Sequence, residues 1–175
     1  MFVEGKGGLK MKIAIDVMGG DNGPATIIRG AIMACNSNHK LHLILVGKSD
    51  IIRRELKKYD YNEDKIEIVP ASQVIEMDEA PSKALRKKKD SSIAIASGLV
   101  RENKADAFVS AGSTGAVMAS GLLKIGRIKG VKRPAIAAVF PGFKGRTLLL
   151  DAGANAKGRS EVLIQHALMG QMYAL

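Results

Sequence analysis

The stretch AFVSAGSTGAVMASG, residues Ala107–Gly121, decides how this chain is interpreted. It opens with a short apolar strand, breaks into the turn Ser110–Gly115, and resumes as a small-residue helix from Ala116. A strand that leads through such a turn into a helix leaves several backbone N–H groups without partners, and these donors attract anions. Because Ser and Thr are also common helix caps, the stretch predicts either an anion site or an ordinary capped turn.

The residue types within this turn suggest what each position would contribute to an anion site. Gly112 and Gly115 would let the backbone approach a phosphate, and Ser110, Ser113 and Thr114 would add hydroxyl donors. The turn is neither a dinucleotide-binding fingerprint nor a nucleotide-binding P-loop, because no Lys follows the second glycine. We therefore treat these five residues as candidate phosphate ligands.

Composition places the chain among globular proteins. Its 175 residues are 46% hydrophobic and only 4% aromatic, so one core filled by aliphatic side chains is expected. The single cysteine, Cys35, excludes an intramolecular disulfide and favours a reducing cytoplasm; at its place in an apolar helix face it is expected to be a buried small hydrophobe. No apolar run is long enough to span a bilayer, and the three histidines and one cysteine match no metal-ligand spacing.

The formal net charge of +10 calls for an anionic partner or serves solubility. Acidic protein, phosphorylated substrate, an anionic membrane surface and nucleic acid would all suit it. Nucleic acid is disfavoured, because the chain has no recognisable nucleic-acid-binding module and no aromatic residues among its basic ones. The densest basic run, Arg86–Lys89, is typical of a solvated helix end.

Apolar segments alternate with helical patterns along the chain. The expected strands are residues 12–17, 41–46, 65–69, 107–109, 134–140 and 146–151. This alternation predicts an α/β fold with a mainly parallel sheet covered on both faces. Gly-rich polar turns follow three of the strands, at residues 18–23, 110–115 and 151–155. Ligands of such sheets bind beyond the carboxyl ends of the strands, so the three turns are expected to share one crevice.

The ends of the chain carry two further expectations. Residues 1–10 have no apolar core of a secretory signal, and they look like an extension upstream of Met11. A last helix is expected from Ser160 onward, with Val162, Leu163, Ala167 and Leu168 in one inward stripe. Residues 11–175 are therefore interpreted as the N-terminal part of one larger α/β domain.

Six short blocks, in order along the chain, resemble the PlsX-type phosphate acyltransferases. They are IAIDVMGGD (13–21), SAGSTGA (110–116), GRIKG (126–130), RPA (133–135), DAGAN (151–155) and MGQMY (169–173). The resemblance implies a three-layer α/β/α fold similar to that of isopropylmalate dehydrogenases and phosphotransacetylases. It also implies transfer of a fatty acyl group from acyl carrier protein to inorganic phosphate without a cofactor, by a cytoplasmic homodimer that associates loosely with the membrane.

On this resemblance, the turns acquire chemical roles. Ser113 and Thr114 would hold the phosphate or the developing oxyanion, and Asn155 would donate to the thioester carbonyl. Residues Gly19, Gly20 and Asp21 would shape the opposite wall of the crevice. The basic side chains of Arg127, Lys129 and Arg133 are candidates for docking the acidic carrier protein. For Asp16 a structural role is preferred, because a bare carboxylate beside phosphate is repulsive.

Three departures from the family pattern bear on these roles. Family members are about twice as long, so part of the crevice is expected to be absent. The family often has Asn where this chain has Ser113, and after Asn155 it usually has an acidic residue, whereas Lys157 follows here. Two alternatives stay open: a phosphotransacetylase-like enzyme that uses coenzyme A thioesters, and a non-catalytic phosphate-binding half-domain.

Overall fold

The computed structural model describes residues 10–143, 145–155 and 158–174. They divide into two compact units, one within residues 4–126 and the other within residues 127–175, and each is described by itself. Of the expected N-terminal extension, only Lys10 lies among the described residues. Lys157 lies outside them, so its effect on the neighbouring turn stays a prediction.

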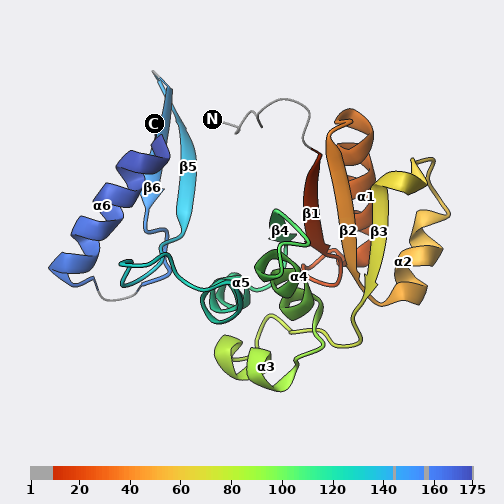
Figure 1. Cartoon of the computed structure of the whole chain (residues 1–175), viewed down its shortest axis with the longest axis horizontal. Helices are drawn as coiled ribbons and strands as arrows, with labels where there is room; N and C mark the ends of the chain where they lie inside the picture. The colour runs from red at the N-terminus through yellow and green to blue at the C-terminus, as the bar shows by residue number, and fades with distance from the viewer. Residues whose placement is uncertain (1–9, 144, 156–157, 175) are drawn as a thin grey trace. The chain divides into compact units, whose positions relative to one another are not determined.

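A four-stranded parallel sheet forms the centre of the first unit (Figure 1). Its strands, in spatial order, are β3 (Ile66–Pro70), β2 (Leu41–Gly47), β1 (Met11–Asp16) and β4 (Ala107–Ser110). Aligned pairs such as Ala14↔Ile44 and Ala14↔Phe108 fix the register of β1 against its two neighbours, β2 and β4. The sequence-based expectation of an α/β fold with a mainly parallel sheet is confirmed.

Helices connect these strands and follow the last of them. They are α1 (Gly23–Ser37), α2 (Ser49–Leu56), the short 3₁₀ turn η1 (Glu63–Lys65), α3 (Pro81–Lys87), α4 (Ser92–Arg101), α5 (Thr114–Ser120) and the π-helical turn η2 (Gly121–Ile125). Pro24 lies in the first turn of α1, where its missing N–H costs nothing. In α2, Ser49 is the first helical residue, and Lys48 occupies the cap position without a side-chain bond.

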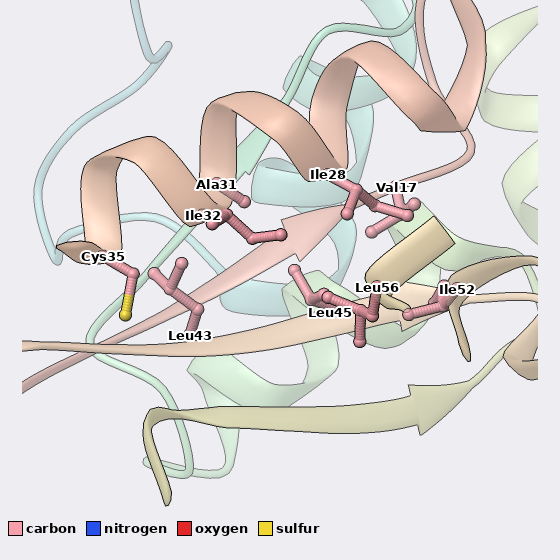
Figure 2. Packing of buried hydrophobic residues seen from close by; sticks show 9 residues of the cluster. All are labelled: Val17, Ile28, Ala31, Ile32, Cys35, Leu43, Leu45, Ile52 and Leu56. Carbon is pink, nitrogen blue, oxygen red and sulfur yellow. The ribbon is translucent and has the colours of Figure 1, made fainter. Parts of the chain in front are cut away.

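One face of the sheet packs against α1 and α2. Figure 2 shows Ile28, Ala31, Ile32 and Cys35 along one side of α1, facing Leu43 and Leu45 of β2. Spacings of three and four residues place these α1 side chains on a single helical face. Cys35 is fully buried in this cluster, which agrees with its expected role as a small hydrophobe.

The other face of the sheet packs mainly against α4. Ala14 of β1 and the alternate residues Ile44 and Val46 of β2 point to this side and form one buried cluster with Ala96 of α4. Side chains alternate between the two faces along a strand, and here helices cover both faces. The central strands are therefore apolar at nearly every residue rather than at every second one. The first unit therefore has three layers, with helices on both faces of the sheet.

The second unit consists of a β-hairpin and one long helix. Strands β5 (Ala137–Gly142) and β6 (Gly145–Leu150) pair antiparallel, and α6 spans Ser160–Ala174. We expected two apolar strands here within a mainly parallel sheet, but they form a separate two-stranded sheet. The physical reason is the short link between the paired residues Gly142 and Gly145, since a parallel pair needs a crossover of a dozen or more residues.

The inward face of α6 also differs from expectation. Val162 and His166 are buried, whereas Leu163 and Leu168 are 58% and 56% exposed. The helix is apolar on most sides, so its sequence does not single out one stripe. Among the described residues, no helix combines the length and apolar character required to cross a membrane.

Candidate functional site

The turns after β1 and β4 lie at a topological switch point of the sheet. The chain runs outward from β1 through β2 to β3 and then returns to place β4 on the free side of β1. Asp16 and Ser110, the last residues of β1 and β4, are register partners. The helix after β1 packs on one face of the sheet, and α5 packs with α3 and α4 on the other. Open α/β sheets bind ligands at such points.

The carboxylate of Asp16 joins the two turns. Its Oδ1 accepts hydrogen bonds from the backbone N–H groups of Met18 and Gly19, each at 3.1 Å, and its Oδ2 accepts one from the Ser110 hydroxyl at 2.7 Å. The Ser110 oxygen in turn accepts a hydrogen bond from Gly112 N at 3.0 Å. Asp16 is only 3% exposed, and these donors satisfy a charge that would otherwise be costly to bury.

Two glycines allow the turns to touch. A Cβ added to Gly19 would lie 2.8 Å from Gly112 N and 2.7 Å from Asp16 Oδ2, closer than side chains approach. Gly20 has φ +95°, a left-handed conformation that favours glycine. The neighbouring Asp21 is exposed. Gly19 and Gly20 therefore lie beside the β4 turn, and both have a conformational or steric reason to be glycine.

The β4 turn ends in a capped helix. Ser113 is the N-cap of α5, and its Oγ accepts a hydrogen bond from Ala116 N at 3.4 Å. The hydroxyl hydrogen of Ser113 is not used in that bond, so it is still able to donate to a ligand. Thr114 and Gly115 are exposed, and their N–H groups have no acceptor within the helix because they belong to its first turn. The turn is thus both a capped helix start and a polar surface at the switch point.

In the second unit, a carboxylate organises the turn at 151–155. Asp151 accepts hydrogen bonds from the backbone N–H groups of Ile136, Ala154 and Asn155, at 2.8, 3.2 and 2.7 Å. Burial by itself raises the pKa of the Asp151 carboxyl, but the hydrogen bonds outweigh it and hold that pKa below its usual range. The sequence analysis did not single out Asp151. Its signal is shared with Asp16: an Asp at the end of a strand, followed closely by glycine.

Asn155 belongs to the same network. Its Nδ2 donates to Asp151 Oδ2 at 3.0 Å and to the carbonyl oxygen of Pro134 at 3.1 Å, while Arg133 Nη1 lies 3.5 Å from its Oδ1. Both amide hydrogens are therefore directed at protein acceptors in this structure. The expected role of Asn155 toward a thioester carbonyl stays a prediction.

The basic residues considered for docking differ in their contacts. Arg127 Nη1 donates to the carbonyl oxygen of Lys132 at 2.6 Å, and Lys132 itself pairs with Glu161. Lys129 is exposed. Arg127 and Arg133 thus contact the loops of their own unit, and Lys129 is the simplest of the three candidates to test.

The structure brings together part of the expected site. Gly19, Gly20, Ser110, Gly112 and the start of α5 meet at the end of the sheet of the first unit. Asn155 and the basic candidates belong to the second unit, which is described by itself. In the described part of the chain, no group of three or more His, Cys, Asp or Glu side chains is placed to hold a metal ion.

A hollow opens at the same edge of the sheet, beyond β2 and β3. Its volume is about 460 Å³, and Lys48, Ser49, Asp50 and Ser72 are among its lining residues. Asp90, also in the lining, accepts hydrogen bonds from the N–H and hydroxyl of Ser72. The sequence analysis missed this hollow because its residues come from separate segments that show no motif.

Comparison with known proteins gives consistent matches over this chain. A family model described as "Fatty acid synthesis protein" matches residues 11–175. Curated relatives named "Phosphate acyltransferase" include those of Halothermothrix orenii (55% identical over 94% of this chain), Heliobacterium modesticaldum (52% over 94%) and Clostridium acetobutylicum (50% over 93%). In each case the match covers 49% of the relative. The chain thus spans about half the length of the curated relatives it matches.

Proposed function

Because the chain belongs to the fatty acid synthesis protein family, we propose that it supplies the phosphate-binding turns of a phosphate acyltransferase. The proposed reaction moves a fatty acyl group from acyl carrier protein to inorganic phosphate and yields acyl phosphate for phospholipid synthesis. The observation that carries the proposal is the position of the Ser110–Gly115 turn at the topological switch point, beside β1. The names of the relatives support the acyl transfer chemistry.

The proposed chemistry needs neither a covalent enzyme intermediate nor a cofactor. An oxygen of hydrogen phosphate bonds to the thioester carbonyl carbon, the C–S bond breaks, and the leaving sulfur takes up the phosphate proton to give the free carrier thiol. The protein has to hold the dianion and stabilise the oxyanion that develops on the carbonyl oxygen. We assign the first task to Ser113 and Thr114, whose hydroxyls lie at the start of α5.

We propose supporting roles for four residues of the second unit. Asn155 is proposed to donate to the carbonyl oxygen after exchanging one of its two present acceptors. Arg127, Lys129 and Arg133 are proposed to attract the acidic carrier protein, since complementary charge speeds encounter more than it tightens a complex. A cytoplasmic homodimer that associates loosely with membranes is proposed from the family resemblance; sedimentation and vesicle flotation test these two properties.

Phosphate binding is the first property to test, and it does not require turnover. We expect phosphate added to the ¹⁵N-labelled chain to shift the amide signals of Ser113–Gly115. Thr114→Val removes one hydroxyl and should weaken binding by about fivefold, which corresponds to a net contribution of about 1 kcal/mol from one hydrogen bond. Ser37→Ala, which removes an exposed hydroxyl bonded within α1, is the matched control and should leave binding unchanged. Shifts confined to other parts of the chain would contradict the assignment.

The acyl donor separates this proposal from its alternatives. Phosphate-dependent release of free thiol is measured with acyl-carrier-protein and acyl-coenzyme A thioesters, using this chain and the full-length Halothermothrix orenii relative. Release from the carrier thioester alone supports the proposal. Release from coenzyme A thioesters alone favours a phosphotransacetylase-like enzyme. Phosphate binding by this chain without release from either donor favours a phosphate-binding half-domain.

A further inference from the structure

The Ser110 hydroxyl points its one hydrogen at a buried carboxylate. Ser110 Oγ lies 2.7 Å from Asp16 Oδ2, and it accepts the N–H of Gly112 at 3.0 Å. A serine hydroxyl has one hydrogen, so a donor bond to Asp16 leaves none for a ligand. The N–H of Gly112 is likewise occupied. Two groups that the sequence suggested as anion donors are therefore engaged within the protein.

Asp16 is well held in this arrangement. Its other oxygen accepts the N–H groups of Met18 and Gly19, so both carboxylate oxygens have partners from two different turns. The backbone of Gly19 fills the space between Asp16 and Gly112, because even a Cβ at residue 19 would lie within 3.0 Å of both. The carboxylate thus fixes the position of the β4 turn through Ser110 and leaves little room for adjustment.

We propose that Asp16 is a positioning residue that withholds Ser110 and Gly112 from the anion, so that Ser113 and Thr114 are the polar side chains that bind it. This inference rests on the proposed phosphate-binding function. It removes Ser110 from the candidate phosphate ligands. Asp16 also places a carboxylate next to the Ser110–Gly115 turn. A negative charge there weakens anion binding, whereas the hydrogen bonds of Asp16 hold the turn in one geometry.

The proposal predicts effects of opposite sign for two substitutions. In Asp16→Asn the amide can still accept from Met18 and Gly19 through its oxygen, but its nitrogen donates to Ser110. The hydrogen of the Ser110 hydroxyl is then free to bond to a ligand, and one negative charge is lost. We expect phosphate to bind about fivefold more tightly, as the loss of one unit charge at this range allows. A substitution that merely damaged the fold would weaken binding instead.

Ser110→Ala is the second variant, and its interpretation does not depend on how an asparagine amide at position 16 would be oriented. It removes a hydroxyl that does not bind the anion and frees the N–H of Gly112, so we expect phosphate affinity to change by less than about twofold. Thr114→Val, by contrast, should lower it by about fivefold. The ¹⁵N spectrum of each variant reports whether the fold is retained. If Asp16→Asn does not fold, Ser110→Ala decides the question alone. A loss of affinity in Ser110→Ala equal to that in Thr114→Val would overturn the proposal.

Amide exchange separates this inference from the proposed function. Without any phosphate, Ser110→Ala should speed hydrogen exchange at Gly112 and leave Gly19 protected, because Asp16 still accepts from Gly19. If the unmodified chain binds no phosphate, the proposed function fails, and with it the ligand role of Ser113 and Thr114. The positioning role of Asp16 is then read from exchange alone: it stands if Gly112 exchange speeds up and fails if exchange is unchanged.

Discussion

Gly19 lies directly against the backbone of Gly112. A Cβ at position 19 would come within 2.8 Å of Gly112 N, and one at position 112 would come within 3.3 Å of the Gly19 Cα. The atoms in the way are backbone atoms of the facing glycine together with the hydrogen-bonded side-chain oxygens of Asp16 and Ser110. The two turns at the switch point are therefore packed glycine against glycine, and neither can move aside without breaking the bonds that Asp16 makes.

We expect Gly19→Ala to destabilise the first unit by about 1–3 kcal/mol, because overpacking forces backbone shifts. The matched control is Gly30→Ala in α1, where an added Cβ meets nothing within 4 Å. This control should stabilise the protein by about 0.5–1 kcal/mol, since alanine is the better helix former. Urea unfolding followed by circular dichroism measures both. Equal effects of the two substitutions would contradict the close contact.

The sequence predicted some features of these two turns and missed others, depending on whether the feature is visible in neighbouring residues. The strand, turn and helix at 107–120 could be predicted, because the spacing of apolar residues and a turn rich in Gly, Ser and Thr are both visible within a short stretch of sequence. The bonds that join Asp16 to Ser110 could not, because they link residues 94 positions apart in the chain. The sequence therefore identified the residues of this turn, but it predicted that Ser110 binds the phosphate. In the structure Ser110 is hydrogen-bonded to Asp16 and holds the turn in place.

The second unit was predicted less well, for a different reason. Its strands are apolar and uninterrupted, and that pattern fits a buried parallel strand as well as this hairpin. The short link between Gly142 and Gly145 was the signal that could have decided between them. Likewise α6 carries apolar residues on most of its faces, so its inward side cannot be read from spacing.

The pH dependence of the second unit should depend on Asp151. Its pKa is lowered in the folded protein, so its contribution to stability is complete above about pH 4, the ordinary aspartate value, and is lost as pH falls through the lowered pKa. Asp151→Asn should reduce stability at pH 7 and make the unit less sensitive to acid. Amide exchange at Ala154 measures this, with the exposed Asp60→Asn as control. Unchanged acid sensitivity in Asp151→Asn would count against the network.

Cys35 should react slowly with thiol reagents while the protein is folded. Burial raises the pKa of its thiol, and the nearby charge of Lys65 offsets only part of that effect. Its side chain is also fully buried between α1 and the sheet (Figure 2). We expect labelling by a disulfide reagent to be at least about a hundredfold slower than in denaturant. Rapid labelling of the native chain would show that α1 does not cover this cysteine as described.

Substitutions on α6 should separate its two sides. Leu168 is 56% exposed and Val162 is 6% exposed, although both are apolar residues of one helix. Leu168→Glu should change stability by less than about 0.5 kcal/mol, as surface substitutions do. Val162→Asp should cost at least about 2 kcal/mol, because it buries a charge without a partner. Thermal unfolding of the two variants gives the comparison, and a large loss in Leu168→Glu would mean that the exposed side of α6 is covered in solution.

Lys129 provides the cleanest test of the proposed carrier-protein docking. It is exposed, whereas Arg127 and Arg133 contact the loops of their own unit, so reversing their charge would also disturb those loops. In a full-length enzyme that carries this half, Lys129→Glu should slow association with acyl carrier protein by about threefold to tenfold at low salt. The effect should shrink above about 0.5 M salt, where screening removes long-range attraction. Lys57→Glu, an exposed position at the end of α2, controls for net charge. If both reversals slow association equally, the attraction comes from the overall positive charge and not from the surface around Lys129.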